Sequence, residues 1–184
     1  ATRTAGCLCG AQRSGAWCAG KWSSACRSLL LRLYGCLYET FGPQDWWPGD
    51  TPVEIIAGAV LTQNTNWRNV ESAISNLRAA GLLSIDALAR AHLRGLYRLI
   101  RPAGYFRLKA RRLRNLFRWL RDNFDASIAR LKSLDPLELR QRLLSEVSGV
   151  GPETADSILL YALEQPVFVV DAYTRRVLSR HGLE

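Results

Sequence analysis

The sequence predicts an all-α protein, on two observations. Apolar residues recur at three- and four-residue spacings in successive segments, as on one face of a helix, and no stretch alternates apolar and polar residues convincingly as a strand would. Short turns rich in Gly, Pro or Asp separate these segments. Helices are expected near residues 27–41, 52–63, 67–80, 85–90, 93–101, 107–123, 136–147, 152–163 and 172–181.

Residues 1–26 have neither helical nor strand periodicity, and we expect them to be flexible. Four cysteines lie here, at Cys7, Cys9, Cys18 and Cys26. Their spacing matches no common zinc site and no histidine is near, so we expect reduced thiols and no bound metal. No continuous apolar run of a signal peptide occurs, and no segment is long and apolar enough to cross a membrane. We therefore expect a cytoplasmic or nuclear protein.

The expected helix at 52–63 begins with a cap. Thr51 precedes Pro52, Glu54 follows three residues after the threonine, and apolar residues then recur at helical spacing. The helix ends in three polar residues, Gln63, Asn64 and Thr65. From composition alone they form a plain polar loop between helices.

The middle of the chain is strongly basic, within a protein of net charge +9. No acidic residue occurs between Ala87 and Leu120, where arginines accumulate and where Lys109 and Arg111 also lie. Apolar residues three and four apart give the helix expected here a basic outer face. Such a face is usually solvated surface, but the sustained absence of acids favours contact with phosphates, weakening as salt rises.

A glycine turn separates the next two helices. The apolar run before it ends at Gly149, Val150 and Gly151, where two glycines permit a tight reversal, and Pro152 stands where a helix should start. Backbone amides in such a turn, with the positive end of the following helix, can hold a phosphate oxygen without any side chain. The turn alone is a weak signal, because many helix pairs end in glycine.

A lone aspartate opens the last expected helix. The apolar run from Val167 to Val170 leads into Asp171. This residue is either an ordinary N-cap or a catalytic carboxylate at the mouth of a cleft, and spacing alone favours the cap.

Together, the hairpin, the apolar run and the aspartate resemble the helix-hairpin-helix DNA glycosylases of the endonuclease III superfamily. The resemblance implies a six-helix barrel over 52–170, containing the helix-hairpin-helix. It also implies a second helical domain that begins with residues 27–51, resumes at 171–184 and is incomplete in this sequence. Asp171 matches the family's catalytic aspartate.

The resemblance is strongest to the endonuclease III-like 3-methyladenine DNA glycosylases, which share WWP before the first core helix and LTQNT at its end. It implies a base pocket formed by Trp46, Trp47, Pro48, Trp67 and Glu153. Glu153 stands where strand-cleaving members of the superfamily carry a Schiff-base lysine. A carboxylate cannot form an imine, so the resemblance implies a monofunctional enzyme that uses water as its nucleophile.

The resemblance also implies the DNA contacts. In the superfamily the glutamine matching Gln63 enters the gap left by a flipped-out nucleotide, and GYFRLKA at 104–110 resembles the turn into the basic helix. The residues expected to contact DNA are Gln63, Asn64, Thr65, Lys109, Arg111, Gly149, Val150, Gly151 and Thr154.

The expected partner is double-stranded DNA with a damaged base, bound by a monomer that needs no membrane. We expect no cofactor in this sequence; many relatives hold a 4Fe-4S cluster on cysteines beyond the catalytic aspartate, and a segment following Glu184 would decide that point. Two alternatives stay open: a glycosylase for oxidised or mismatched pyrimidines, and a non-catalytic DNA-binding module. Trp46, Trp67 and Glu153 suit a cationic base better than a neutral pyrimidine.

Overall fold

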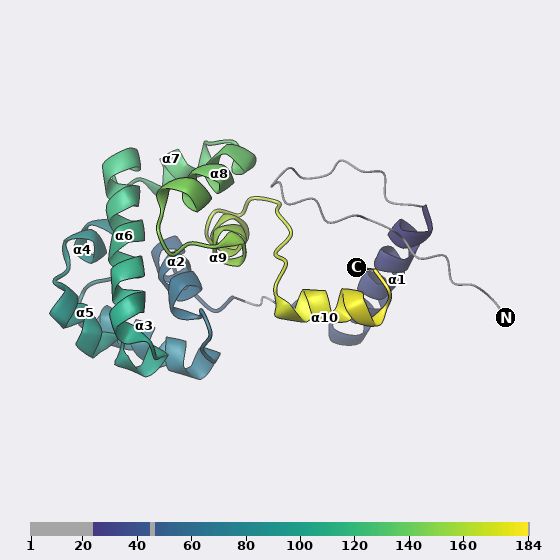
Figure 1. Cartoon of the computed structure of the whole chain (residues 1–184), viewed down its shortest axis with the longest axis horizontal. Coiled ribbons are helices and arrows are strands. Elements are labelled where there is room, and N and C mark those ends of the chain that lie inside the picture. The colour runs from purple at the N-terminus through teal and green to yellow at the C-terminus, as the bar shows by residue number, and fades with distance from the viewer. Residues whose placement is uncertain (1–23, 45–46, 184) are drawn as a thin grey trace. The chain divides into compact units, whose positions relative to one another are not determined.

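The computed structural model describes residues 24–44 and 47–183. The chain divides into two units, which we describe separately. One is the compact unit Trp47–Val170 (Figure 1). The described parts of the other are residues 24–44 and 171–183. Of the segment expected to be flexible, residues 1–23 lie outside the described residues, whereas residues 24–26 form the start of a helix, contrary to the prediction.

The compact unit is built from helices joined by short turns. In chain order these are α2 (Pro52–Leu61), α3 (Trp67–Ala79), α4 (Ile85–Arg90), α5 (Leu93–Leu99), the short 3₁₀ turn η1 (Arg101–Ala103), α6 (Phe106–Phe124), α7 (Ile128–Lys132), α8 (Pro136–Glu146), α9 (Pro152–Ser157) and the π-helical turn η2 (Ile158–Ala162). The other unit contains α1 (Ser24–Phe41) and α10 (Ala172–Arg180). The residues described contain no strand, which confirms the all-α prediction.

Side-chain caps fix where many of these helices begin. Thr51 accepts a hydrogen bond from the Glu54 amide at 3.2 Å, and Asp135 accepts bonds from two amides at the start of α8. Each such bond satisfies an amide that has no partner inside the helix and stabilises the start by about 1 kcal/mol. Ser127 caps α7 in the same way. This helix was absent from the sequence prediction, because five residues are too few to display a periodicity.

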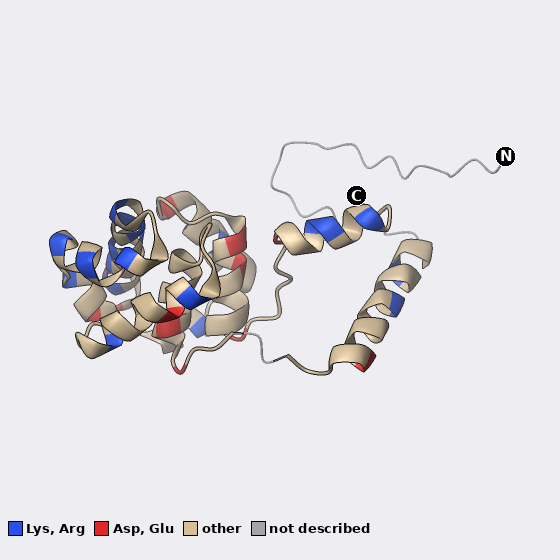
Figure 2. Cartoon of the chain, turned by 90° about the horizontal axis from the view of Figure 1, so that it is seen from below, with Lys and Arg blue, Asp and Glu red and all other residues tan. Residues whose placement is uncertain are grey.

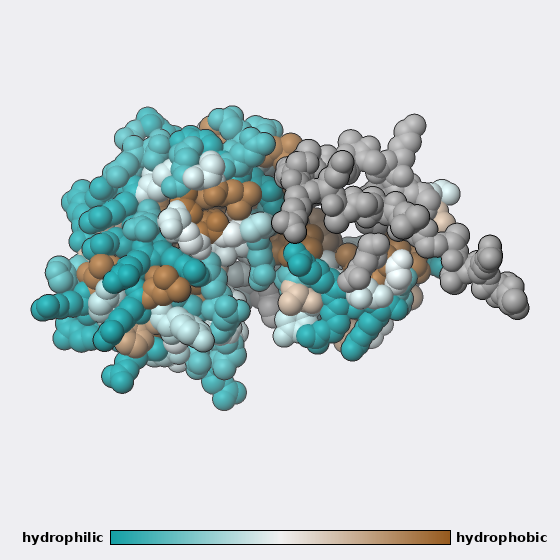
Figure 3. Space-filling model, in the orientation of Figure 1, coloured by the Kyte–Doolittle hydropathy of each residue, from teal (hydrophilic) through white to brown (hydrophobic). Residues whose placement is uncertain are grey.

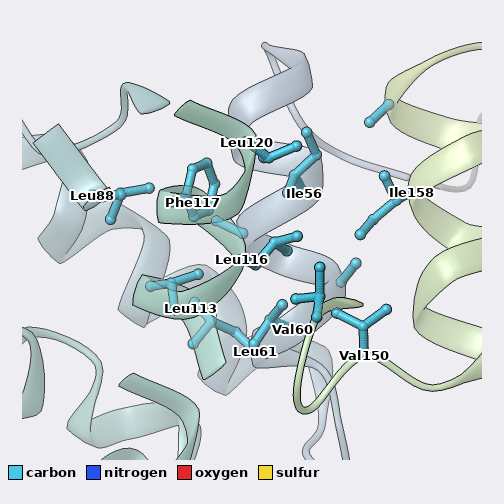
Figure 4. Packing of buried hydrophobic residues seen from close by; sticks show 14 of the residues in the cluster. Ile56, Val60, Leu61, Leu88, Leu113, Leu116, Phe117, Leu120, Val150 and Ile158 are labelled. Carbon is cyan, nitrogen blue, oxygen red and sulfur yellow. The ribbon is translucent and has the colours of Figure 1, made fainter. Parts of the chain in front are cut away.

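Helix α6 lies at the centre of the core. Leu113, Leu116, Phe117 and Leu120 form its apolar face, and each is at most 2% exposed. Figure 4 shows these side chains meeting Leu88 of α4 on one side and residues of α2 on the other. Full burial of each such side chain contributes about 1.5–3 kcal/mol. The loops that join α6 to its neighbouring helices are therefore attached to a well-packed core.

The last helix of the compact unit changes its hydrogen-bond pattern part-way. The prediction of one helix over 152–163 is correct in extent, but the structure has α9 followed by the π turn η2. In η2 the Leu163 amide donates to the Ile158 carbonyl at 3.2 Å, five residues back. The wider turn leads into the extended segment before Val170, which has no regular structure.

Charge and hydropathy are unevenly spread over the surface. Lysines and arginines gather at the end of the compact unit formed by α4, α5 and α6 (Figure 2). The face seen in Figure 3 is mostly hydrophilic, with small apolar patches.

Helices α1 and α10 have no buried residue. Across the described ranges, no helix combines the length and the apolar character needed to span a membrane.

One charged side chain lies in the core beside α6. Lys109 is only 2% exposed, and its Nζ donates to the carbonyls of Leu61 and Ala103 at 2.8 and 2.7 Å and to Thr65 Oγ1 at 2.9 Å. Three N–H groups thus meet three acceptors. Burial, and secondarily repulsion from Arg112, lowers the pKa of Lys109 from 10.5 to about 8.

This lowered pKa predicts how stability depends on pH. Between pH 8 and 10.5 the unfolded chain binds more protons at Lys109 than the folded chain does, so the contribution of this group to stability rises with pH in that window and is at its lowest below pH 8. Relative to Lys109→Met, the wild type should gain about 1–3 kcal/mol of unfolding free energy across the window. Urea denaturation of both proteins at several pH values measures this difference. If the unfolding free energies of the two proteins depended on pH in the same way, the lowered pKa of Lys109 would be contradicted.

Candidate functional site

The turn between α8 and α9 forms a compact hairpin. Gly149 has φ +95°, and a Cβ at this position would lie 2.3 Å from Cγ of Arg112, so only glycine fits. Val150 is 7% exposed and anchors the hairpin in the core (Figure 4). Among the described residues the amides of Gly149 and Gly151 donate to no protein acceptor. They are therefore available to an anion at the start of α9.

A buried ion pair joins the two helices of this hairpin. Arg140 of α8 makes two hydrogen bonds to the carboxylate of Asp156 on α9, from Nε at 2.5 Å and from Nη2 at 3.0 Å. Asp156 is 3% exposed. A forked pair of this kind fixes the relative orientation of two helices, and loss of one partner would leave an unpaired buried charge. The ion pair therefore holds the hairpin in shape.

Gln63, in the loop between α2 and α3, is bonded to the hairpin. Its Nε2 donates to the Gly149 carbonyl at 3.1 Å and to Thr154 Oγ1 at 3.0 Å, and its Oε1 accepts a hydrogen bond from Arg112. Insertion of Gln63 into a duplex would break all three bonds. In the structure the Gln63 amide connects protein segments, and its insertion into DNA stays a prediction. Thr154 is 7% exposed, so its hydroxyl is also occupied inside the protein.

The rest of this loop contains both exposed and inward-facing residues. We call residues 62–66 the α2–α3 loop. Asn64 is exposed at φ +52°, in the left-handed region that asparagine tolerates. Thr65 instead donates its hydroxyl hydrogen to the Ala103 carbonyl at 2.6 Å and accepts a bond from Lys109. Gln63 and Thr65 are bonded inward, whereas Asn64 is exposed; Asn66 is also exposed, but its side chain accepts a hydrogen bond from the Asn69 amide as the cap of α3.

A second exposed residue was missed by the sequence reasoning. Tyr105 is 73% exposed and has φ +43°, which is uncommon for a bulky residue. It follows Gly104 in what we call the α5–α6 turn, residues 100–105, which is bonded to the α2–α3 loop through Thr65. An exposed aromatic in strained backbone is typical of a ligand contact. Its signal in the sequence was an aromatic directly after a turn glycine.

Of the two predicted DNA contacts on α6, Lys109 is buried and Arg111 is exposed. Lys109 cannot reach a phosphate, because its buried ammonium is already bonded to three protein oxygens, so that prediction is wrong. Arg111 is exposed, and no ion pair holds it within the described chain. Four residues along the helix from Arg107, it lies on the same face.

Four of the predicted base-pocket residues can be placed, and Trp46 lies outside the described residues. The rings of Trp47 and Trp67 meet edge to face with centroids 5.5 Å apart. Both rings pack over Gly58, where a Cβ would be 3.4 Å from Trp47 and 3.6 Å from Trp67. The sequence prediction did not include Gly58, whose contact is visible only once the two rings are in place.

A cavity of about 400 Å³ opens beside the Trp67 ring, and Trp47 does not line it. Its lining includes Pro48 and Trp67 and the charged residues Asp50, Glu54, Glu71 and Arg78. Glu71 accepts a hydrogen bond from the Trp67 indole at 2.9 Å, and Glu54 is buried against Arg78. Carboxylates thus outnumber cations three to one in the lining. Glu153, exposed in the first turn of α9, is not among the lining residues.

Asp171 is the N-cap of α10. Its Oδ1 accepts hydrogen bonds from the Thr174 amide at 2.7 Å and from Thr174 Oγ1 at 2.8 Å. In the described part of the chain no hydrogen bond reaches Oδ2. The two interpretations of Asp171 are therefore compatible, since one oxygen makes the cap while the other stays available.

The described residues contain no cluster of His, Cys, Asp and Glu that could hold a metal ion. Cys26 and Cys36 are the cysteines within the described ranges, and both lie on α1, more than two turns apart. Residues 172–184 include no cysteine. The described residues thus do not fit an iron–sulfur cluster.

Comparison with known proteins agrees with this arrangement. Residues 57–184 match the family model for HhH-GPD superfamily base excision DNA repair proteins. The chain is 47% identical over 156 residues to a protein of Methanocaldococcus jannaschii named as a DNA repair glycosylase, covering 84% of this chain and 70% of that protein. It is also 31% identical over 128 residues to endonuclease III of Sulfolobus acidocaldarius, which covers 69% of this chain but only 55% of that enzyme.

Solved structures show the same fold. The crystal structure of the H. pylori 3-methyladenine DNA glycosylase bound to 1,N6-ethenoadenine matches with a TM-score of 0.71 and 30% identity, over 86% of this chain and 74% of that one. A non-covalent endonuclease III–DNA complex matches with a TM-score of 0.68 and 23% identity, over 85% of this chain and 69% of that one. The chain therefore belongs to the HhH-GPD superfamily of base excision DNA repair proteins.

Proposed function

We propose that this protein is a monofunctional DNA N-glycosylase that removes alkylated purines such as 3-methyladenine from duplex DNA. The observation that carries the proposal is the Asp171 carboxylate, which is fixed through Oδ1 and leaves Oδ2 without a protein partner in the described chain. Membership of a base excision repair family and the acidic aromatic cavity beside Trp67 support it.

Asp171 would act on the sugar. When the bond between C1' and the base breaks, the bonding electron pair leaves with the base and positive charge develops at C1' and the ring oxygen. A fixed carboxylate stabilises that charge and orients water for attack at C1'. Water oxygen then forms the new bond to C1', and its proton passes to the carboxylate or to solvent. A purine methylated at N3 carries a positive charge before cleavage and leaves as a neutral molecule.

Water is the proposed nucleophile because no described lysine is placed for imine chemistry. The chain has three lysines: Lys21, Lys109 and Lys132. Lys21 lies outside the described residues, Lys109 is buried, and Lys132 on α7 is paired with Glu164 at 2.7 Å. The residue two after the glycine hairpin is Glu153, and a carboxylate cannot form a Schiff base.

The surroundings of Trp67 favour a cationic base. A cation over an indole face gains about 0.5–2 kcal/mol depending on desolvation, and a neutral base lacks this gain. Asp50, Glu54 and Glu71 beside a single arginine add negative potential to the cavity. The protein with 30% identity in its solved structure is named as a 3-methyladenine DNA glycosylase. A second candidate, removal of damaged pyrimidines, rests on the 31% identity to an endonuclease III.

Unpaired arginines suggest how the protein would bind flanking DNA. The ion pairs of the compact unit involve cations outside 91–120. No described carboxylate forms an ion pair with Arg94, Arg98, Arg107, Arg111 or Arg118. Arg107 and Arg111 lie on one face of α6, the helix that begins directly after Tyr105. Duplex DNA, with one negative charge per about 1.7 Å of axis, is the partner that such a face would fit.

The first test is excision and its dependence on Asp171. Duplexes with 3-methyladenine, uracil, thymine glycol or 8-oxoguanine are incubated with the protein, with and without alkali. We expect release of 3-methyladenine, strand breaks only after alkali, and a rate at least about 10³-fold lower for Asp171→Asn with DNA affinity little changed. Alkali-independent breaks would contradict the monofunctional mechanism, and near-normal turnover by the variant would contradict the role of Asp171.

The second test is salt dependence. Arg107→Gln/Arg111→Gln should lower the slope of log K against log salt for undamaged duplex by up to about 2, because each lost phosphate contact removes about 0.9. The control Arg130→Gln/Lys132→Gln removes the same charge from α7, where both cations are already paired. Equal slopes for the two double variants would show that the α6 face does not contact DNA.

A further inference from the structure

We propose that Lys109 is a positioning residue for base flipping: its buried ammonium locks the α2–α3 loop to the α5–α6 turn and so fixes the spacing of Asn64 and Tyr105. The inference rests on the proposed function and adds to it a residue that need not touch DNA. Its starting point is a side chain that the sequence suggested as a phosphate contact and that the structure places in the interior.

The three bonds of Lys109 reach three different segments. The Leu61 carbonyl is the last of α2, the Ala103 carbonyl is the last of η1, and Thr65 belongs to the α2–α3 loop. Carbonyls at helix ends lack a partner within their own helix. Thr65 also donates directly to the Ala103 carbonyl at 2.6 Å. Removal of the ammonium would therefore release several contacts at once.

Burial of this cation has a cost that packing alone does not require. None of its three acceptors is a carboxylate, so no opposite charge compensates for the loss of hydration. An apolar side chain of similar length would fill the same space without this penalty. A three-donor group can do what an apolar group cannot, which is to hold three chain segments at one point.

The exposed residues lie close in sequence to the locked atoms. Asn64 directly precedes Thr65, and Tyr105 is two residues after Ala103. Both have positive φ, at +52° and +43°, and such conformations persist when the surrounding contacts impose them. A side chain that pushes into a base stack must resist displacement. The Lys109 lock supplies that resistance to both exposed residues.

Helix α6 provides the fixed reference for these contacts. Lys109 and Arg112 lie one turn apart on α6, and both bond to the α2–α3 loop, the first at Thr65 and the second at Gln63. The apolar face of the same helix is fully buried in the core. The loop is thus held on both sides of Asn64 by one rigid element.

The lock is tested first in the protein without DNA. Amide hydrogen exchange at 62–66 and 103–106 is compared in wild type, Lys109→Met and Thr65→Val. We expect exchange at least about tenfold faster in both variants, because each removes part of the same network. Leu120→Ala is the control, since it weakens the core at the far end of α6 and touches neither loop. If Lys109→Met does not fold, Thr65→Val alone tests the lock. Unchanged exchange in the loops, or an equal change in Leu120→Ala, would overturn the proposal.

The consequence for DNA is measured by fluorescence. A duplex with 2-aminopurine next to a tetrahydrofuran abasic analogue reports local unstacking at saturating protein. We expect the fluorescence gain to fall at least about fivefold in Lys109→Met and Thr65→Val, with affinity for undamaged duplex within about twofold of wild type. The double variant should lose no more than either single variant, because both break one network. Additive losses would contradict a shared lock.

The exchange, fluorescence and excision experiments together distinguish failure of the positioning role of Lys109 from failure of the glycosylase proposal. If the wild type excises no base, the glycosylase proposal fails, while loop exchange still decides whether Lys109 locks the two segments. If the wild type excises 3-methyladenine and Lys109→Met flips and excises normally, the positioning role fails and the glycosylase proposal stands.

Discussion

The arrangement of this protein depends on the side chain of Gln63. Its amide bonds to the hairpin at Gly149 and to α9 at Thr154, and it accepts a bond from Arg112 of α6. These segments are far apart in sequence: one is a turn, one is the start of α9 and one is the middle of α6. One planar amide with two donors and an acceptor bonds to all of them together. Gln63 occupies the Gly149 carbonyl and the Thr154 hydroxyl, while among the described residues the Gly149 and Gly151 amides stay available to an anion.

The hydrogen bonds within the protein explain why the exposed residues differ from the polar residues that the sequence suggested as DNA contacts. Gln63, Thr65 and Lys109 are bonded inward, whereas Asn64 and Tyr105 are exposed in left-handed backbone. In the α2–α3 loop, the exposed Asn64 thus lies between two residues that are bonded inward. The Arg140–Asp156 ion pair also supports the hairpin, because it fixes α8 against α9. The interior polar network gives shape, and the exposed residues are left for contact.

The sequence predicted the helices well where periodicity and caps agree, as at Thr51 with Glu54 and along the apolar face of α6. It missed α7, which is too short to be periodic, and the π turn, which depends on tertiary context. Residue types also predicted that the hairpin needs glycine, and Gly149 against Arg112 shows why. The direction in which a polar side chain points could not be predicted from the sequence. Whether Lys109 points outward or inward is set by acceptors 6 and 48 residues away in the chain, which no local pattern contains.

The most direct measurement is amide exchange of residues 149–154 in Gln63→Met, without DNA, beside affinity for undamaged duplex. If Gln63 organises the hairpin, exchange there should accelerate at least about tenfold and affinity should fall with it. If hairpin exchange is unchanged while affinity or excision is lost, Gln63 acts by entering the duplex itself, and the central claim is wrong.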